Sequence, residues 1–241
     1  MKKKRTIVTS SWDDGHPLDL KLSSMLQSQK IPGTFYIPLK NQEFSTINDN
    51  EIRLLSNFFE IGAHTFNHVE LPNLSESKIL DELQSSKLKL EEITRDDITS
   101  FCYPRGKHSL TVRDLVKKSG YNFARTTELF ETKVIDPFLC GTTLQCVNRS
   151  FASKIKQLMI SHNTKLKLKL MSGTVYKNWN VIAKKTFDYV VENGGIWHLW
   201  GHSWEIDANN DWENLRDVLE YVRINGLKNN VEFLNNNQIS T

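Results

Sequence analysis

Residues 6–15 read Thr-Ile-Val-Thr-Ser-Ser-Trp-Asp-Asp-Gly, a run rich in β-branched residues that ends in two adjacent carboxylates and a glycine. The run predicts a first strand, Thr6–Ser11. Apolar residues at helical spacing follow over Leu18–Gln29, and Pro32-Gly33 breaks the chain before a second predicted strand, Thr34–Ile37. This order of elements predicts a βαβ unit with parallel strands.

The same alternation continues to the end of the sequence. Further strands are predicted at Phe58–Ala63, Ile98–Tyr103, Asn122–Thr127, Ile196–Trp200 and Val231–Leu234. Helices are predicted at Asp49–Asn57, from the capping residues 73–77 to about Glu92, and at Leu110–Lys118, Asn180–Val191 and Trp212–Arg223. About seven or eight β-like segments favour a closed or nearly closed α/β barrel.

The segment Glu128–Val175 has no clear pattern. Within it, Lys165–Leu170 alternates strictly between lysine and leucine, which favours a half-exposed strand; a basic helix edge is the alternative.

Composition excludes several classes of protein. A chain of 241 residues is compatible with one domain over residues 1–241, and no apolar run approaches the roughly 20 residues that cross a bilayer. The net charge of +3 is small beside 31 basic and 28 acidic residues, so nucleic acid is not an expected partner. Cys102, Cys140 and Cys146 lack the CxxC spacing of a thiolate zinc site.

The first five residues, Met-Lys-Lys-Lys-Arg, resemble the basic part of a secretion signal. Only two apolar residues follow within Thr6–Ser10, too few for the apolar part of such a signal. We therefore expect a cytoplasmic protein.

Four unusual clusters follow predicted strands. They are Trp12–His16, His64–His68, Tyr103–Gly106 and His198–His202. Because functional groups in α/β barrels gather where parallel strands end, we expect the four clusters to meet at one face. Each cluster alone is more often a turn, a loop or a pair of ordinary histidines, but their joint position at strand ends favours a functional site.

The first two clusters have the chemistry of a metal site. Adjacent carboxylates after a buried strand need a positive charge nearby, which a divalent cation supplies. Histidines four residues apart, His64 and His68, can lie on one side of a helical turn and bind one metal together with a carboxylate from another loop. Three protein ligands leave a position for water, as in catalytic zinc sites.

The sequence resembles the polysaccharide deacetylase family, also called the NodB-homology family, with motifs over nearly the whole chain. Ser-Trp-Asp-Asp-Gly at residues 11–15 is similar to the family's first motif, Thr-Phe-Asp-Asp-Gly, and implies Asp13 as catalytic base and Asp14 as metal ligand. Residues 64–68 are similar to the second motif, His-Ser/Thr-x-x-His, which implies His64 and His68 as the other ligands. The resemblance implies a distorted (β/α) barrel of about seven strands.

The third motif, Arg-x-Pro-Tyr, matches only at Pro104, because Cys102 takes the arginine position and Arg105 the tyrosine position. In the family the arginine holds the catalytic carboxylate, so Arg105 becomes a candidate to reach Asp13 instead. The resemblance also implies that the Arg105 backbone N–H helps to bind the oxyanion. We assign Tyr103, in the same loop, to substrate binding.

The fifth motif, Leu-x-His, is most similar to Trp200-Gly201-His202, which implies His202 as the catalytic acid. His198 is the alternative, and we prefer His202 because it lies closer to the expected mouth of the barrel. Trp200 takes the place of the leucine that packs on the acetyl methyl group. His198 and Trp200 share a strand face with His202, so both are assigned to substrate binding.

The fourth motif, Asp-x-x-Asp-Trp, is not found, and Asp136 or Asp207 is a candidate to orient His202. Five aromatic residues are expected near the mouth, where they could stack on sugar rings: Trp12, Phe66, Trp197, Trp200 and Trp204.

The resemblance implies a hydrolase that removes N-acetyl groups from a saccharide with the help of Zn²⁺ or another divalent transition metal. For a cytoplasmic chain, we expect an intermediate of cell-surface polysaccharide synthesis, such as O-antigen or capsule, as substrate. One alternative is a related metal-dependent amidase that acts on a formamide or a cyclic imide. Another is a non-catalytic glycan-binding relative, which the missing fourth motif and the altered third motif favour.

Overall fold

The computed structural model describes residues 4–171, 173 and 177–239, and its strands form one parallel sheet. The first residues of the basic start, 1–3, and residues 172, 174 and 175 of the unassigned segment lie outside the described residues. The strands are β1 (Thr6–Asp13), β2 (Thr34–Ile37), β3 (Glu60–Ala63), β4 (Ser100–Cys102), β5 (Phe123–Arg125), β6 (Leu144–Gln145), β7 (Gly195–Gly201) and β8 (Glu232–Phe233).

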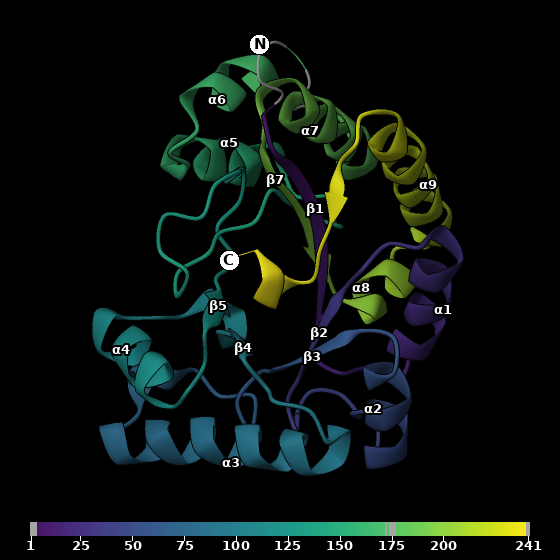
Figure 1. The fold of residues 1–241 in the computed structure, drawn as a ribbon. Coiled ribbons are helices and arrows are strands. Elements are labelled where there is room, and N and C mark those ends of the chain that lie inside the picture. The colour runs from purple at the N-terminus through teal and green to yellow at the C-terminus, as the bar shows by residue number, and fades with distance from the viewer. Residues whose placement is uncertain (1–3, 172, 174–176, 240–241) are drawn as a thin grey trace.

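The sheet curls into a half-barrel in which β1 lies between β2 and β7 (Figure 1). The strand order is β5-β4-β3-β2-β1-β7-β6, and β8 pairs with β1 outside this path. Beyond β5, residues 137–140 continue the hydrogen bonding, since Ala124 N donates to Pro137 O at 2.8 Å and Cys140 N donates to Ala124 O at 3.0 Å. The distorted barrel of about seven strands is confirmed.

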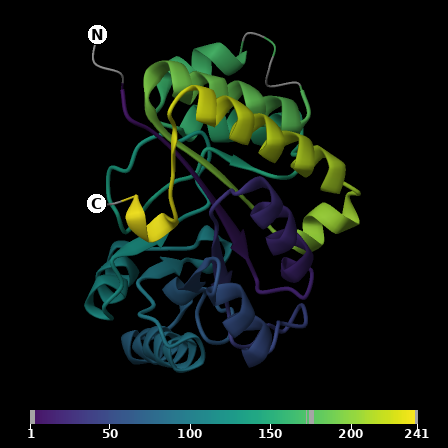
Figure 2. The same cartoon turned by 45° about the vertical axis from the view of Figure 1, so that its right-hand side comes forward.

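Helices cover the outside of the sheet (Figure 1). They are α1 (Asp19–Gln29), α2 (Asp49–Ser56), α3 (Glu76–Thr94), α4 (Leu110–Lys118), α5 (Phe151–Ile160), α6 (Thr164–Met171), α7 (Trp179–Asn193), α8 (Ser203–Ala208) and α9 (Trp212–Lys228). Short 3₁₀ turns lie at Leu71–Asn73 (η1), Pro104–Gly106 (η2) and Asn236–Gln238 (η4). The long helices α7 and α9 lie side by side across β7 and β1 (Figure 2).

Local patterns predict most of these elements. β2 and α4 have the predicted bounds, and α1, α2, α3, α7 and α9 differ from theirs by a few residues at one or both ends. β1 is longer than predicted because it continues through Trp12 to Asp13, and all of its residues are buried. The strand therefore carries the first carboxylate of the Asp-Asp pair on its own last residue.

The expected strand at Lys165–Leu170 is wrong, because these residues belong to α6. Leu166 and Leu170 are four residues apart and fully buried, with exposed fractions of 0% and 1%, whereas Leu168 is 68% exposed. A strand would place all three leucines on one face, but a helix turns Leu168 to the opposite side. The unassigned segment also contains β6 and α5.

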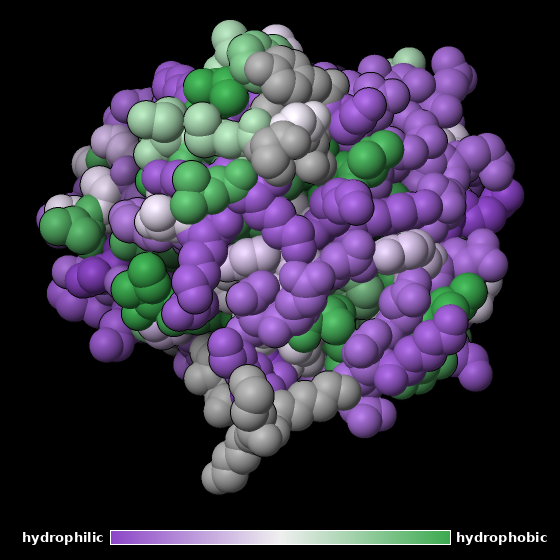
Figure 3. Space-filling view, turned by 90° about the horizontal axis from the view of Figure 1, so that it is seen from above, coloured by the Kyte–Doolittle hydropathy of each residue, from purple (hydrophilic) through white to green (hydrophobic). Residues whose placement is uncertain are grey.

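The face seen from above Figure 1 is mostly hydrophilic, with hydrophobic residues interspersed (Figure 3). Among the described residues, no helix combines the length and the apolar character that crossing a membrane requires.

The helical face of α6 can be tested with two leucines. Leu166→Ala is expected to lower the free energy of unfolding by about 2–5 kcal/mol, because it removes a fully buried side chain. Leu168→Ala, on the exposed side of the same helix, is expected to change it by less than about 0.5 kcal/mol. Urea unfolding followed by circular dichroism measures both. Equal losses would instead fit a strand with one buried face.

Candidate metal and catalytic site

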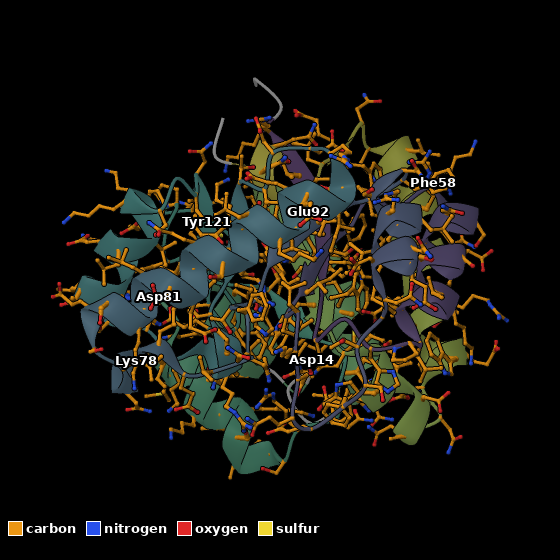
Figure 4. All side chains as sticks on the ribbon, turned by 90° about the horizontal axis from the view of Figure 1, so that it is seen from below. Asp14, Phe58, Lys78, Asp81, Glu92 and Tyr121 are labelled. Carbon is orange, nitrogen blue, oxygen red and sulfur yellow. The ribbon has the colours of Figure 1, made fainter. Side chains whose placement is uncertain are left out.

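The expected clusters meet at the carboxyl ends of the strands, around a cavity of about 280 Å³. Asp14 is buried and projects near the middle of the view in Figure 4, whereas Lys78 and Asp81 lie on α3 and Phe58 lies in the turn after α2. The lining includes eight residues that the sequence singled out: Asp13, Asp14, His64, His68, Arg105, Trp200, His202 and Trp204. Four more lining residues are Glu43, Thr127, Gln145 and Arg149.

Asp14, His64 and His68 form a cluster with the geometry of a metal site. One ligand atom from each lies within 4.8 Å of the others. Asp14 Oδ1 is 3.2 Å from His68 Nε2 and 3.7 Å from His64 Nε2. The other carboxylate oxygen, Oδ2, accepts a hydrogen bond from Trp204 Nε1 at 2.9 Å. Trp204 therefore orients the carboxylate so that Oδ1 faces the two imidazoles.

The ring nitrogens of His64 have distinct roles. His64 Nδ1 lies 2.8 Å from the carbonyl oxygen of Cys102, which can only accept, so Nδ1 carries the proton. Burial lowers the pKa of His64 to about 4, against the opposing charge of Asp13, and the imidazole is therefore neutral at pH 7. Its Nε2 lone pair is free to bind a cation.

Opposing effects act on the Asp14 carboxyl. Burial raises its pKa, but the hydrogen bond to His68 and the charges of His202 and His64 lower it more. The net pKa lies below the ordinary value of 3.8, so Asp14 is ionised at neutral pH.

The two histidines meet on a loop, which corrects the expected helical turn. Thr65 and His68 have left-handed backbones, with φ of 61° and 54°. Glu82 of α3 holds the loop in this shape, because its Oε2 accepts from the backbone N–H groups of Phe66 and Asn67, each at 2.9 Å. Asp14 also has a positive φ, 80°. Such strained backbone is typical of functional sites.

Asp13 forms a buried ion pair with Arg125, the last residue of β5. Arg125 Nη2 donates to both carboxylate oxygens of Asp13, and the guanidinium lies over the ring of Trp200, 4.8 Å from its centroid. Burial lowers the pKa of Arg125, but the adjacent Asp13 charge raises it above its ordinary value. The pair offsets the cost of burying both charges.

The expectation that the Arg105 side chain reaches Asp13 is wrong. Arg105 is half-exposed and forms ion pairs with Glu43 and, at 3.7 Å, with Glu70. The direction of the two side chains explains the error. η2 turns Arg105 outward with a φ of 55°, whereas the end of β5 points Arg125 into the barrel. Arg105 is nevertheless one of the residues that line the cavity.

His202 follows β7 and is oriented by Glu205. His202 Nδ1 lies 2.7 Å from Glu205 Oε2, and its Nε2 is 3.8 Å from Asp14 Oδ2. Burial lowers the pKa of His202, but the hydrogen bond to Glu205 and the charge of Asp14 outweigh this effect, so the pKa lies above 6.5. A histidine protonated near neutral pH suits a general acid.

Neither aspartate suggested as a partner of His202 has that role. Asp136 forms an ion pair with Arg113 at 3.0 Å, and Asp207 accepts from Trp212 Nε1 at 2.7 Å. Glu205 takes the place because the first turn of α8 brings the third residue after His202 back beside it.

Two residues assigned to substrate binding, Tyr103 and His198, do not line the cavity. The Tyr103 hydroxyl donates to Phe138 O at 2.9 Å, and its ring packs on Phe101. His198 lies deeper in the barrel, where its Nε2 is 2.8 Å from Ser11 Oγ. It shares a strand face with Trp200 but sits below the open end, which favours His202 over His198 as the acid.

Of the five aromatic residues expected near the mouth, two line the cavity and three do not. Trp200 and Trp204 line the cavity, and the Trp204 ring stacks on Phe44 at 4.6 Å between centroids. Trp12 and Trp197 are buried, and the Phe66 ring lies beneath Lys40 Nζ at 5.7 Å. Trp200 and Trp204 are therefore the two placed to contact a ligand.

Sequence reasoning missed Arg125 and Glu205. The signal for Arg125 was a charged residue inside a predicted buried strand, Asn122–Thr127, where an unpaired guanidinium would be costly. The signal for Glu205 was its spacing of three residues from His202 at a helix start. Neither signal identifies the partner.

Comparison with known proteins identifies the same family. The polysaccharide deacetylase family model matches residues 1–124. The matched part contains Asp13, Asp14, His64 and His68, whereas His202 comes from the remainder of the chain. No curated protein matches the sequence.

Solved structures share the fold over almost the whole chain. A putative polysaccharide deacetylase from Mycobacterium smegmatis is 16% identical, with a TM-score of 0.65 over 99% of this chain and 90% of that one. A family 4 acetyl xylan esterase from Clostridium thermocellum, in complex with a cobalt ion, is 14% identical, with a TM-score of 0.56 over 97% and 90%. At these identities the likeness concerns the fold.

A Streptococcus pyogenes deacetylase in complex with acetate is 16% identical, with a TM-score of 0.52 over 55% of this chain. The match spans 62% of that protein's length, so the chain covers less than two thirds of it.

The two candidate partners of Asp13 differ in their expected effect on stability. Arg125→Ala is expected to lower the free energy of unfolding by about 3–5 kcal/mol, because it leaves a buried carboxylate unpaired. Arg105→Ala removes an exposed ion pair and is expected to cost less than about 1 kcal/mol. Chemical denaturation at pH 7 measures both. Similar losses would contradict the assignment of Arg125 to Asp13.

The pKa of His202 is expected to depend on Glu205. Glu205→Gln removes a negative charge that favours the protonated imidazole, so the pKa should fall. NMR titration of the histidine ring protons measures it, and any activity that needs protonated His202 should then be lost at lower pH. Asp207→Asn is the matched control and should leave the titration in place; an equal shift in the control would refute the role of Glu205.

Proposed function

Because the chain belongs to the polysaccharide deacetylase family, we propose that it hydrolyses the N-acetyl groups of a saccharide with the help of a divalent cation. The observation that carries this proposal is the convergence of Asp13, the Asp14–His64–His68 cluster and His202 on one cavity. A catalytic base, a metal site and a catalytic acid are the groups that such a hydrolysis requires.

The donor set fits a transition metal such as zinc. Two imidazole nitrogens and one carboxylate oxygen are typical ligands of catalytic zinc, and cobalt, nickel or iron accept the same set. His64 is fixed in the tautomer that leaves Nε2 available, and Trp204 turns one Asp14 oxygen toward the histidines. A cation held there would lower the pKa of a water molecule and polarise the acetyl carbonyl.

Different residues around this cluster accept a proton, bind the oxyanion and donate a proton. Asp13, held by Arg125, takes the proton from the attacking water. The Arg105 backbone N–H donates to the oxyanion that forms on the acetyl carbonyl. His202, protonated and held by Glu205, gives its proton to the leaving amine. Base and acid therefore come from the carboxyl ends of two neighbouring strands, β1 and β7.

The substrate that we propose is an intermediate of cell-surface polysaccharide synthesis, O-antigen or capsule, in the cytoplasm. Family membership supports an acetylated saccharide, and Trp200 and Trp204 offer aromatic surface to a sugar ring. We also propose that residues 1–241 make one catalytic domain, since β7 pairs with β1 over seven residues and brings His202 to the site begun by β1.

Metal content and turnover are expected to separate under mutation. Asp13→Asn and His202→Ala should each lower kcat by about 10²–10⁴-fold while the metal stays bound. His64→Ala should lose the metal itself, because it removes a ligand. Elemental analysis and an acetate-release assay measure the two effects. Full activity of the wild type after exhaustive chelation would refute the metal dependence.

The reaction itself is tested by a mass-spectrometric screen for loss of acetyl groups from nucleotide sugars and glycan oligomers. Matched formyl and imide compounds in the same screen separate deacetylation from other amide hydrolysis. Turnover of imides alone would refute the proposed substrate class.

A further inference from the structure

Arg149 is a cation in the cavity wall that has no anionic partner among the described residues. It lies between β6 and α5, two residues before the first residue of α5, and lines the same cavity as the metal cluster. Its Nη2 donates to the side-chain oxygen of Gln145, a neutral group. Its Nε is buried and has no hydrogen-bond partner in the part of the chain that the structure describes. A buried guanidinium nitrogen without an acceptor is costly unless a ligand supplies one.

The other cations of the wall are satisfied. Arg105 forms an ion pair with Glu43, and His202 is hydrogen-bonded to Glu205. Arg149 thus differs from Arg105 and His202, each of which has a carboxylate partner. Burial lowers the pKa of Arg149 and the charge of Glu205 raises it, with a net lowering, but an arginine guanidinium stays protonated in proteins.

Gln145 fixes the guanidinium in place and connects it to the catalytic acid. The Gln145 side-chain oxygen accepts from Arg149, and its Nε2 donates to Glu205 Oε2 at 2.9 Å. The same Glu205 oxygen lies 2.7 Å from His202 Nδ1. One row of hydrogen bonds therefore runs from Arg149 to His202, and Gln145 stands between the guanidinium and the carboxylate that would otherwise neutralise it.

We propose that Arg149 binds an anionic group of the substrate, a carboxylate or a phosphate, so that the enzyme acts on negatively charged N-acetylated saccharides. The inference rests on the proposed deacetylase function and names its substrate class. A guanidinium presents a planar set of N–H donors that matches either anion. The acceptor that Nε lacks would come from the ligand.

The size of the cavity limits where the anion lies on the substrate. A volume of about 280 Å³ is near the lower end of ligand sites. Arg149, His202 and Asp14 line this one space. The anionic group therefore belongs to the acetylated sugar itself or to the group attached directly to it.

Acetate release from matched substrates tests the proposal. N-Acetylglucosamine is the neutral compound, N-acetylmuramic acid supplies a carboxylate, and N-acetylglucosamine 1-phosphate supplies a phosphate. The wild type is expected to prefer one or both anionic compounds in kcat/KM by about 10- to 100-fold, as for one charge-assisted contact. The two anionic compounds distinguish a carboxylate from a phosphate. Equal kcat/KM for all three would overturn the proposal.

Variants assign the preference to Arg149. Arg149→Gln should lower kcat/KM for the anionic compounds at least ten times more than for the neutral one, mainly through KM. Arg149→Lys should keep part of the preference, because it keeps the charge but not the planar donors. Arg216→Gln, which alters an exposed arginine paired with Glu213, is the matched control. A uniform loss over all three compounds would show that Arg149 only holds Gln145.

Binding of compounds that lack an acetyl group separates this proposal from the proposed function. In calorimetry, glucose 1-phosphate or glucuronate should bind to the wild type at least ten times more tightly than to Arg149→Gln. Glucose should show no such difference between the two proteins. If none of the acetylated compounds is hydrolysed and this difference persists, the deacetylase function fails while the anion site stands. If hydrolysis occurs and wild type and variant bind the anionic compounds equally, the anion site fails alone.

Discussion

Two adjacent carboxylates at the end of a fully buried strand are the constraint on which the site depends. Asp13 and Asp14 are 2% and 4% exposed, and neither charge could stay there without a positive partner. The two carboxylates have different positive partners. Arg125 neutralises Asp13 permanently, whereas Asp14 faces two imidazoles that a cation would complete. The end of β1 thus holds a fixed ion pair, Asp13 with Arg125, beside a site suited to an exchangeable cation at Asp14.

This division explains why the two aspartates have different chemistry despite being neighbours. Asp13 shares its oxygens with a guanidinium that is itself held between the rings of Tyr36 and Trp200. Asp13 is therefore buried beside a fixed positive partner. Asp14 has one oxygen occupied by Trp204 and the other directed at the histidines. The positive backbone φ of Asp14 turns its side chain away from the direction that Asp13 takes.

The position of His202, the proposed catalytic acid, depends on the pairing of β7 with β1. Some 180 residues separate the two strands in the sequence, and their pairing places His202 beside Asp14. β6 then adds Gln145 next to β7, and Gln145 connects Arg149 with Glu205. Hydrogen bonds through Gln145 and Glu205 therefore connect the proposed anion-binding residue, Arg149, with His202. The half of the chain outside the family match supplies His202, Gln145 and Arg149.

By itself, the sequence determined the alternation of strands and helices and the residues that could bind a metal. Periodicity is a local property, and Asp13, Asp14, His64 and His68 stand in motifs directly after strands, so both features can be read along the chain. Only the tertiary structure decided that Arg125 pairs with Asp13, that Glu205 orients His202 and that Arg149 faces the cavity unpaired. Those contacts depend on which strands become neighbours and on the direction in which each strand end points its side chain. The same reason applies to α6, since packing of Leu166 and Leu170 against the core, and not the alternation of lysine and leucine, selected the helix.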